Sequence, residues 1–134
     1  PLPHDAAEGA VRGLVTGFRF ELDGVSIFHP GDLGRPLSAS EAATLGRVDV
    51  LLLPVGGTFT IDPAGALDTI AVLRPAVAIP MHYLVPAVRL QLLPLDAFLA
   101  VAPEFERVAI QPMQFDRATL PGPTRVLVPD PLHG

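Results

Sequence analysis

A chain of 134 residues, with a formal charge of −5 and no cysteine, forms one domain at most and cannot build a disulfide or a thiolate metal site. Its acidic balance argues against broad nucleic-acid binding, although its nine basic residues are all arginine and one of them could hold a substrate phosphate. Hydrophobic residues make up 49% of the chain. One explanation is an apolar face that packs on a partner layer, and the other is a source organism whose proteins are rich in Ala, Val, Leu and Pro.

The first firm element is a β-hairpin. Residues 15–22 alternate apolar and polar side chains, as a half-buried strand does. The side chains expected to face inward are Phe18, Phe20 and Leu22. Asp23-Gly24 is a hairpin turn, and residues 25–28 return as the partner strand. The hairpin therefore delivers Asp32 to a strand end, where α/β proteins keep binding groups. The alternative is a tight turn in which this carboxylate only bonds nearby amides.

A short helix and a buried strand come next. Ser38 and Glu41 form a capping-box pattern, and Gly46 ends the helix that they open. Residues 48–53 are a nearly continuous apolar run, which is typical of a strand covered on both faces. The pair Gly56-Gly57 then breaks the run, either in an ordinary turn or to let the backbone approach a ligand closely.

A second helix and a second buried strand complete the pattern. Asp62 is an N-cap followed by proline, and the helix is expected to run to about Leu73. Its inward side chains are expected to be Leu67, Ile70 and Ala71, with Leu73 as a further candidate. Residues 77–80 form the next strand, which leads into His82. Alternating strands and helices predict a partly parallel sheet whose strand-end loops open on one edge.

The C-terminal third carries a weaker signal. Residues 84–93 are apolar and are expected to form a loop over the site, and Asp96 is expected to cap a short helix. Residues 107–110 and 125–128 predict two short strands, whereas His133 lies in a Pro-rich tail and is given no role. No apolar run reaches the ~18 residues of a membrane span, and we expect a cytoplasmic location.

Three residues at element boundaries have the chemistry of metal ligands. Asp32 and His82 each follow an apolar strand, and His4 lies at a boundary near the start. A carboxylate and two imidazoles suit a zinc-like divalent ion, whereas a lone histidine is more often structural. Asp5 could orient His4 as a hydrogen-bond acceptor, and His29 could line the same site or simply pack.

Three blocks of sequence carry a resemblance to a known family. They are Phe28-His29-Pro30-Gly31-Asp32-Leu33-Gly34, Val48-Asp49-Val50-Leu51-Leu52-Leu53-Pro54-Val55-Gly56-Gly57 and Ile79-Pro80-Met81-His82-Tyr83. In order and spacing they resemble the second half of a metallo-β-lactamase-fold hydrolase, in the branch of ascorbate-phosphate lactonase-like and metal-dependent hydrolase proteins. The resemblance implies an α/β fold, namely the C-terminal half of an αββα sandwich, with a mixed sheet and flanking helices.

The resemblance also implies roles for individual residues. Asp32 matches the metal-bridging, catalytic aspartate, His82 the last metal histidine and His4 the middle one. Tyr83 is expected to donate to a substrate oxygen and Gly57 to let substrate approach the backbone, although ordinary packing explains Tyr83 equally well. The family signature His-x-His-x-Asp-His, which supplies most ligands of both metals, does not occur in the sequence.

The implied function is that of a metal-dependent hydrolase. One or two zinc or manganese ions would supply a metal-bound hydroxide that attacks a small-molecule ester, lactone, amide or phosphodiester. Residues 1–134 are then expected to be the C-terminal half of the domain, partnered by an N-terminal half polypeptide or by a second copy of the chain. The alternative is a non-catalytic binding or scaffold module that keeps the half-fold without a competent metal site.

Overall fold

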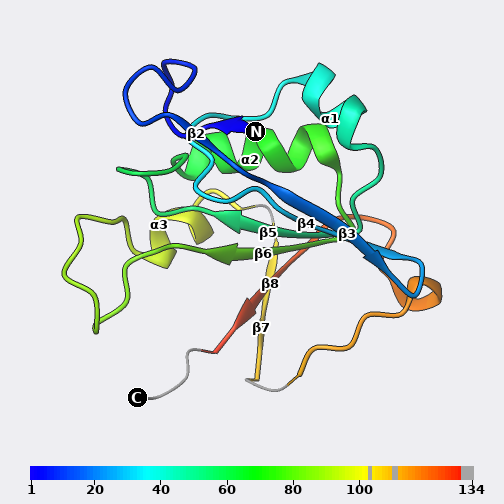
Figure 1. The fold of residues 1–134 in the computed structure, drawn as a ribbon. Coiled ribbons are helices and arrows are strands. Elements are labelled where there is room, and N and C mark those ends of the chain that lie inside the picture. Colours follow the sequence, from blue (N-terminus) through cyan, green and yellow to red (C-terminus); the bar gives the residue numbers. More distant parts are fainter. Residues whose placement is uncertain (103, 110–111, 131–134) are drawn as a thin grey trace.

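The computed structural model describes residues 1–102, 104–109 and 112–130. Its centre is a six-stranded sheet in the order β3-β4-β5-β6-β8-β7 (Figure 1). These strands are β3 (Phe18–Leu22), β4 (Val25–His29), β5 (Val50–Pro54), β6 (Val77–Met81), β7 (Phe105–Val108) and β8 (Arg125–Pro129). The β3–β4 pair is antiparallel and every other neighbouring pair is parallel, so the predicted α/β fold with a mixed sheet is confirmed.

The hairpin forms as its sequence predicts, but its outer strand is not half-buried. Asp23 and Gly24 have φ of 50° and 78°, the left-handed values that a two-residue hairpin turn requires. The expected inward side chains are exposed: Phe18 by 64%, Phe20 by 50% and Leu22 by 64%. The expectation fails because β3 is an edge strand and its apolar side chains lie on the sheet face away from the helices, where the described residues do not cover them.

Of the three α-helices in the described part of the chain, two begin and end at the predicted residues. In α1 (Ala39–Leu45), Ser38 and Glu41 close the capping box, and Gly46 is the C-cap. In α2 (Pro63–Leu73), the Asp62 carboxylate accepts a hydrogen bond from the Gly65 amide. The short α3 (Leu95–Leu99) has Pro94 at its N-cap without a side-chain hydrogen bond, so the prediction that Asp96 caps it is wrong.

The buried side of α2 also differs from the expected one. Its buried residues are Gly65, Ala66 and Thr69, whereas Leu67 and Ile70 are only partly buried and Ala71 is exposed. The Thr69 hydroxyl donates to the Gly65 carbonyl and accepts from the Leu37 amide. These small side chains let α2 lie close to the loop that contains Leu37. The larger side chains of the helix therefore lie beside this contact and are only partly buried.

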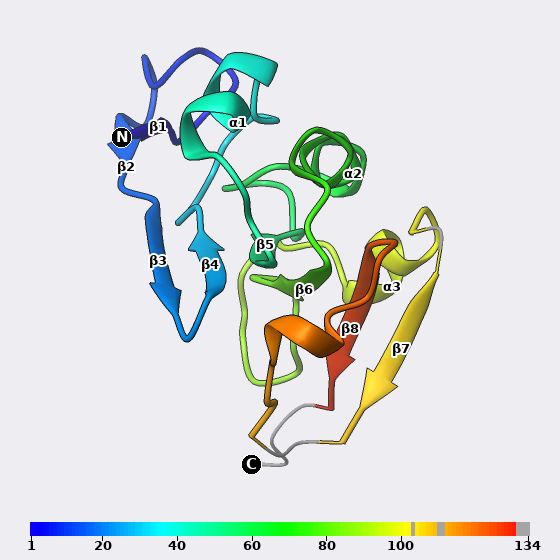
Figure 2. The same cartoon turned by 90° about the vertical axis from the view of Figure 1, so that its right-hand side faces the viewer.

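The two faces of the sheet carry two separate cores. On the helix side, Phe28, Leu51, Leu53 and Val128 pack with residues of the three helices. On the other side, Val25, Val50, Val77 and Ile79 pack with Phe115 and Leu120, from the segment that contains the short helix η1 (Arg117–Thr119). Figure 2 shows α1 and α2 on one side of the sheet and this segment on the other. The central strands are thus covered on both faces, as their sequence predicts.

The C-terminal third follows its prediction only in outline. Residues 84–93 form a loop, held at its base by the hydrogen bond from the Leu84 amide to the Leu93 carbonyl. The strand expected at 107–110 lies at 105–108 as β7, and residue 110 is outside the described residues, as is His133. Among the described residues, the helices are too short to cross a membrane.

Candidate metal centre

The carboxyl ends of three parallel strands bring the predicted ligands to one edge of the sheet. β4 ends three residues before Asp32, and β6 ends immediately before His82. β5 lies between these two strands, and parallel strands end at the same edge. His4 arrives from the short sheet that β1 (Leu2–Pro3) forms with β2 (Leu14–Val15). A hydrogen bond from the Gly34 amide to the Pro3 carbonyl, 2.9 Å long, ties this segment to the Asp32 loop.

Asp32 lies between the two histidines. His4 Nε2 is 3.8 Å from Asp32 Oδ2, and His82 Nε2 is 3.9 Å from Asp32 Oδ1. Both separations are too long for a direct hydrogen bond. His4 Nε2 and His82 Nδ1 are buried and have no hydrogen-bond partner among the described residues. A buried nitrogen without a partner is costly, so these imidazoles need a further ligand or donor.

The donor chemistry and the separations fit divalent ions. Zinc binds nitrogen and carboxylate oxygen at about 2.0–2.2 Å, so two donors of one ion lie at most about 4.3 Å apart. Both separations fall below this limit. In the described part of the chain, no three histidine, aspartate or glutamate side chains gather at one point to hold an ion. Each histidine faces a different oxygen of Asp32.

Two glycines let the histidine segments approach the strand ends. A Cβ on Gly34 would lie 2.1 Å from the Asp5 nitrogen and 2.2 Å from the His4 carbonyl carbon. A Cβ on Gly56 would lie 2.0 Å from the His82 carbonyl oxygen. His82 itself has a φ of 55°, in the left-handed region that non-glycine residues seldom adopt. The backbone around the candidate ligands is therefore fixed by close contacts.

Asp5 organises a loop and does not orient His4. Each of its carboxylate oxygens accepts two backbone hydrogen bonds, with lengths of 2.7–3.1 Å. The donors are the amides of Ala7, Gly9, Val11 and Arg12. These bonds, the one from Arg12 most strongly, lower the pKa of Asp5. The expectation that Asp5 supports the imidazole is wrong, because the backbone of the following loop takes up both oxygens.

Arg35 connects that loop to helix α1. Its guanidinium bonds the carboxylates of Glu8, in the loop, and Glu41, in the helix. The bond to Arg35 lowers the pKa of Glu41 to about 2, and the bonds to Glu41 and Glu8 raise the pKa of Arg35. Sequence reasoning missed this residue, because Glu8 lies 27 positions away and no local pattern joins the two.

The other candidate residues have structural contacts. Gly57 has a φ of 62° and forms a turn in which its amide donates to Ile61 and its carbonyl accepts from Thr60. Tyr83 is partly buried against the helix-side core. His29 accepts a 3.0 Å hydrogen bond from the Gly31 amide through Nδ1, which braces the loop before Asp32. Contact of Tyr83 and Gly57 with a substrate stays a prediction.

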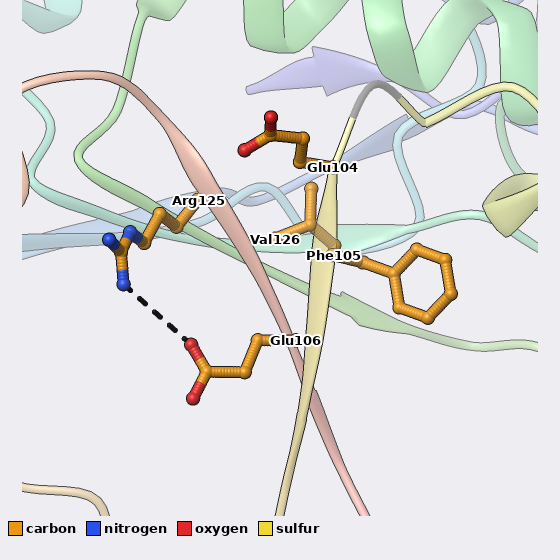
Figure 3. Close-up of a pocket in the computed structure, with 5 residues that line it drawn as sticks. All are labelled: Glu104, Phe105, Glu106, Arg125 and Val126. Atoms are coloured by element: carbon orange, nitrogen blue, oxygen red, sulfur yellow. Dashed lines mark ion pairs between the residues drawn. The ribbon is translucent and has the colours of Figure 1, made fainter.

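A cavity at the opposite edge of the sheet has no comparable chemistry. It measures about 170 Å³ and lies where β7 and β8 begin, between Glu104, Phe105, Glu106, Arg125 and Val126 (Figure 3). Among the described residues of its lining, the one cation is already paired, with Arg125 Nη1 3.7 Å from Glu106 Oε2. The edge that carries Asp32 is therefore the better candidate for a functional site.

Comparison with known proteins identifies related families and folds. Residues 1–82 match the family model described as the β-lactamase superfamily domain. A UPF0173 metal-dependent hydrolase of Archaeoglobus fulgidus is 44% identical over 71 residues, which are 53% of this chain and 31% of that protein. The chain thus spans about a third of such curated relatives.

Two solved structures resemble the fold. One is from Thermotoga maritima and is described as a candidate Zn-dependent hydrolase of the metallo-β-lactamase superfamily. It superposes with a TM-score of 0.75 at 39% identity, over 84% of this chain and 57% of that one. The other, a metallo hydrolase of Ignicoccus hospitalis, gives 0.50 at 35% identity, over 67% of this chain and 38% of that one.

Proposed function

The chain belongs to the metallo-β-lactamase superfamily, and from this premise we propose that it forms part of the metal site of a hydrolase, with His4, Asp32 and His82 as ligands. The observation that carries the proposal is the meeting of these three side chains at one sheet edge, at 3.8 and 3.9 Å. The unpartnered His4 nitrogen supports it, because a bound ion would give His4 Nε2 the partner that it lacks among the described residues.

We propose separate roles for the three ligands. Asp32 offers one oxygen to each side, so His4 and Oδ2 would hold one ion, and His82 and Oδ1 another. A divalent ion in such a site makes water more acidic and polarises the bond to be hydrolysed. The chain's own residues fix the ligands: Gly34 and Gly56 allow the close approach of the backbone, and Asp5 and Arg35 anchor the loop after His4. Zinc is the first choice for a nitrogen and oxygen donor set, with manganese as the alternative.

The remaining ligands would come from outside these residues. We propose that an N-terminal half supplies them and packs on the face of the sheet opposite the three described α-helices, with self-association as the alternative. Phe18, Phe20 and Leu22 support this, because they form an exposed apolar edge beside the covered centre of that face. The substrate is proposed to be a small molecule with an ester, lactone, amide or phosphodiester bond.

Metal retention tests the ligand set. Asp32→Ala and His82→Ala are each expected to reduce the zinc or manganese bound per chain, measured by atomic emission after desalting. The fold should survive, because the Asp32 side chain is about half exposed, and circular dichroism checks it. Asp68→Ala, on the exposed side of α2, removes the same charge and should leave retention unchanged. Equal metal content in all variants would contradict the ligand assignment and favour a non-catalytic module.

A further inference from the structure

A second cavity borders the candidate metal centre on the His4 side. It measures about 380 Å³ and lies between the loop of residues 5–12 and the turn at 58–60. His4, Asp5 and Gly34 form the wall nearest the centre, and Arg12 and Phe59 also line the cavity. A group bound in this cavity would therefore lie directly beside one of the proposed metal ligands.

Arg12 is held in place by hydrogen bonds from its backbone amide and from its guanidinium. Its backbone amide donates to Asp5 Oδ2 at 2.7 Å, and its Nη1 donates to the Thr58 carbonyl at 3.0 Å. Its guanidinium carbon lies 4.9 Å from the centre of the Phe59 ring, within cation–π range. A guanidinium carries five N–H donors in a fixed fork, and the contact to Thr58 uses one nitrogen. The group is thus pre-oriented and keeps donors for another partner.

The described lining of the cavity offers one cation to an anion. Asp5 is the carboxylate in the lining, and four backbone amides bond both of its oxygens. Because these amides occupy the Asp5 oxygens, an anion that enters the cavity can bind the Arg12 guanidinium, the permanent cation of the lining. A planar guanidinium binds carboxylates and phosphates through paired hydrogen bonds.

We propose that Arg12 is a specificity-determining residue, which binds an oxyanion group of the substrate, a carboxylate or a phosphate, in this cavity beside His4. The inference rests on the proposed function, in that the anion belongs to the molecule hydrolysed at the neighbouring centre. It narrows the substrate class to small molecules that carry a negative charge on the part that is not cleaved.

Inorganic phosphate and acetate serve as separate probes of the cavity, in titrations of the metal-free chain followed by amide NMR. Both phosphate and acetate are oxyanions, so whichever binds more tightly identifies the preferred group. The expected result is a saturable shift of the amide signals of Arg12, Phe59 and Thr60. In Arg12→Gln the affinity for the anion should be roughly tenfold weaker or more. The loop should persist in this variant, because the bond to Asp5 comes from the backbone amide.

Two further variants make the test specific. Arg12→Lys keeps the charge and should retain part of the affinity, whereas Arg107→Gln makes the same charge change on exposed strand β7 and should have no effect. Equal shifts in wild type and Arg12→Gln, or none in either, would overturn the inference. Zinc binding is measured on the same proteins before the metal is removed. Absence of zinc binding by the unsubstituted chain would count against the proposed function, whereas absence of anion binding by a chain that does bind zinc would count against the Arg12 inference alone.

Discussion

Gly56→Ala tests whether the close contact at the end of β5 sets the position of His82. The new Cβ would meet the His82 carbonyl oxygen at 2.0 Å, and real contacts of this kind stay above 3.0 Å. The His82 segment must therefore retreat by about 1 Å, whereas metal ligands tolerate about 0.2 Å. Gly56 itself cannot move away freely, because its carbonyl accepts a 2.8 Å hydrogen bond from the Leu93 amide. Overpacking of this kind costs about 1–3 kcal/mol of folding free energy.

Urea unfolding and zinc titration measure the two consequences. We expect Gly56→Ala to lose about 1–3 kcal/mol in the free energy of unfolding and to bind zinc roughly 10–100-fold more weakly. Gly122→Ala is the matched control, because a Cβ there would meet nothing within 4 Å. If Gly56→Ala and Gly122→Ala have the same stability and the same zinc affinity, the glycine does not position His82 and the reasoning fails.

Three other predictions concern the loop, the ion pair and the edge strand. Asp5→Ala should abolish the protection from hydrogen exchange of the amides of residues 7, 9, 11 and 12, and full protection would show that the carboxylate does not hold the loop. Because Arg35 lowers the pKa of Glu41 from 4.5 to about 2, this carboxylate stabilises the fold above pH 4.5, and its contribution fades as the pH falls toward 2. Glu41→Gln should therefore lower the free energy of unfolding by about 1 kcal/mol at pH 7, after allowance for solvent screening, and by progressively less in acid. If the urea midpoint of the variant differs from that of wild type equally at pH 7 and at pH 3, this prediction is wrong. If copies of the chain associate through the β3 face, Phe20→Glu should shift the chain toward monomer in sedimentation velocity, and an oligomer distribution equal to that of wild type would exclude this face as the contact between copies.

Short-range signals made the helix ends and the hairpin predictable. The capping box at Ser38 and Glu41 and the N-cap at Asp62 act over three residues, so the sequence contains both partners of each hydrogen bond. The turn at Asp23-Gly24 is similarly local. Asp32 and His82 were predictable as a pair, because both follow apolar strands and parallel strands end at one edge.

Long-range contacts were not predictable in this way. The alternation in residues 18–22 indicates which side chains share a face, but not whether another layer covers that face, so Phe18 and Phe20 were placed inside. Likewise, the pair Gly56-Gly57 indicated a close approach, but only the fold shows that Gly56 contacts His82 while Gly57 forms the turn. Arg35 has partners far apart in the sequence, and this is why no motif contains it.

The position of β8 within the sheet has a consequence for synthesis on the ribosome. This strand, Arg125–Pro129, comes last among the described strands, yet it lies between β6 and β7. Proteins emerge N-terminus first, so β7 has no strand to pair with until residues 125–129 have left the exit tunnel. Until then β6 presents an open edge with Val77 and Ile79, which are buried in the finished fold. The nascent chain therefore completes its sheet when β8 inserts between β6 and β7. Before that insertion, the open edge of β6 is most exposed to pairing with other chains.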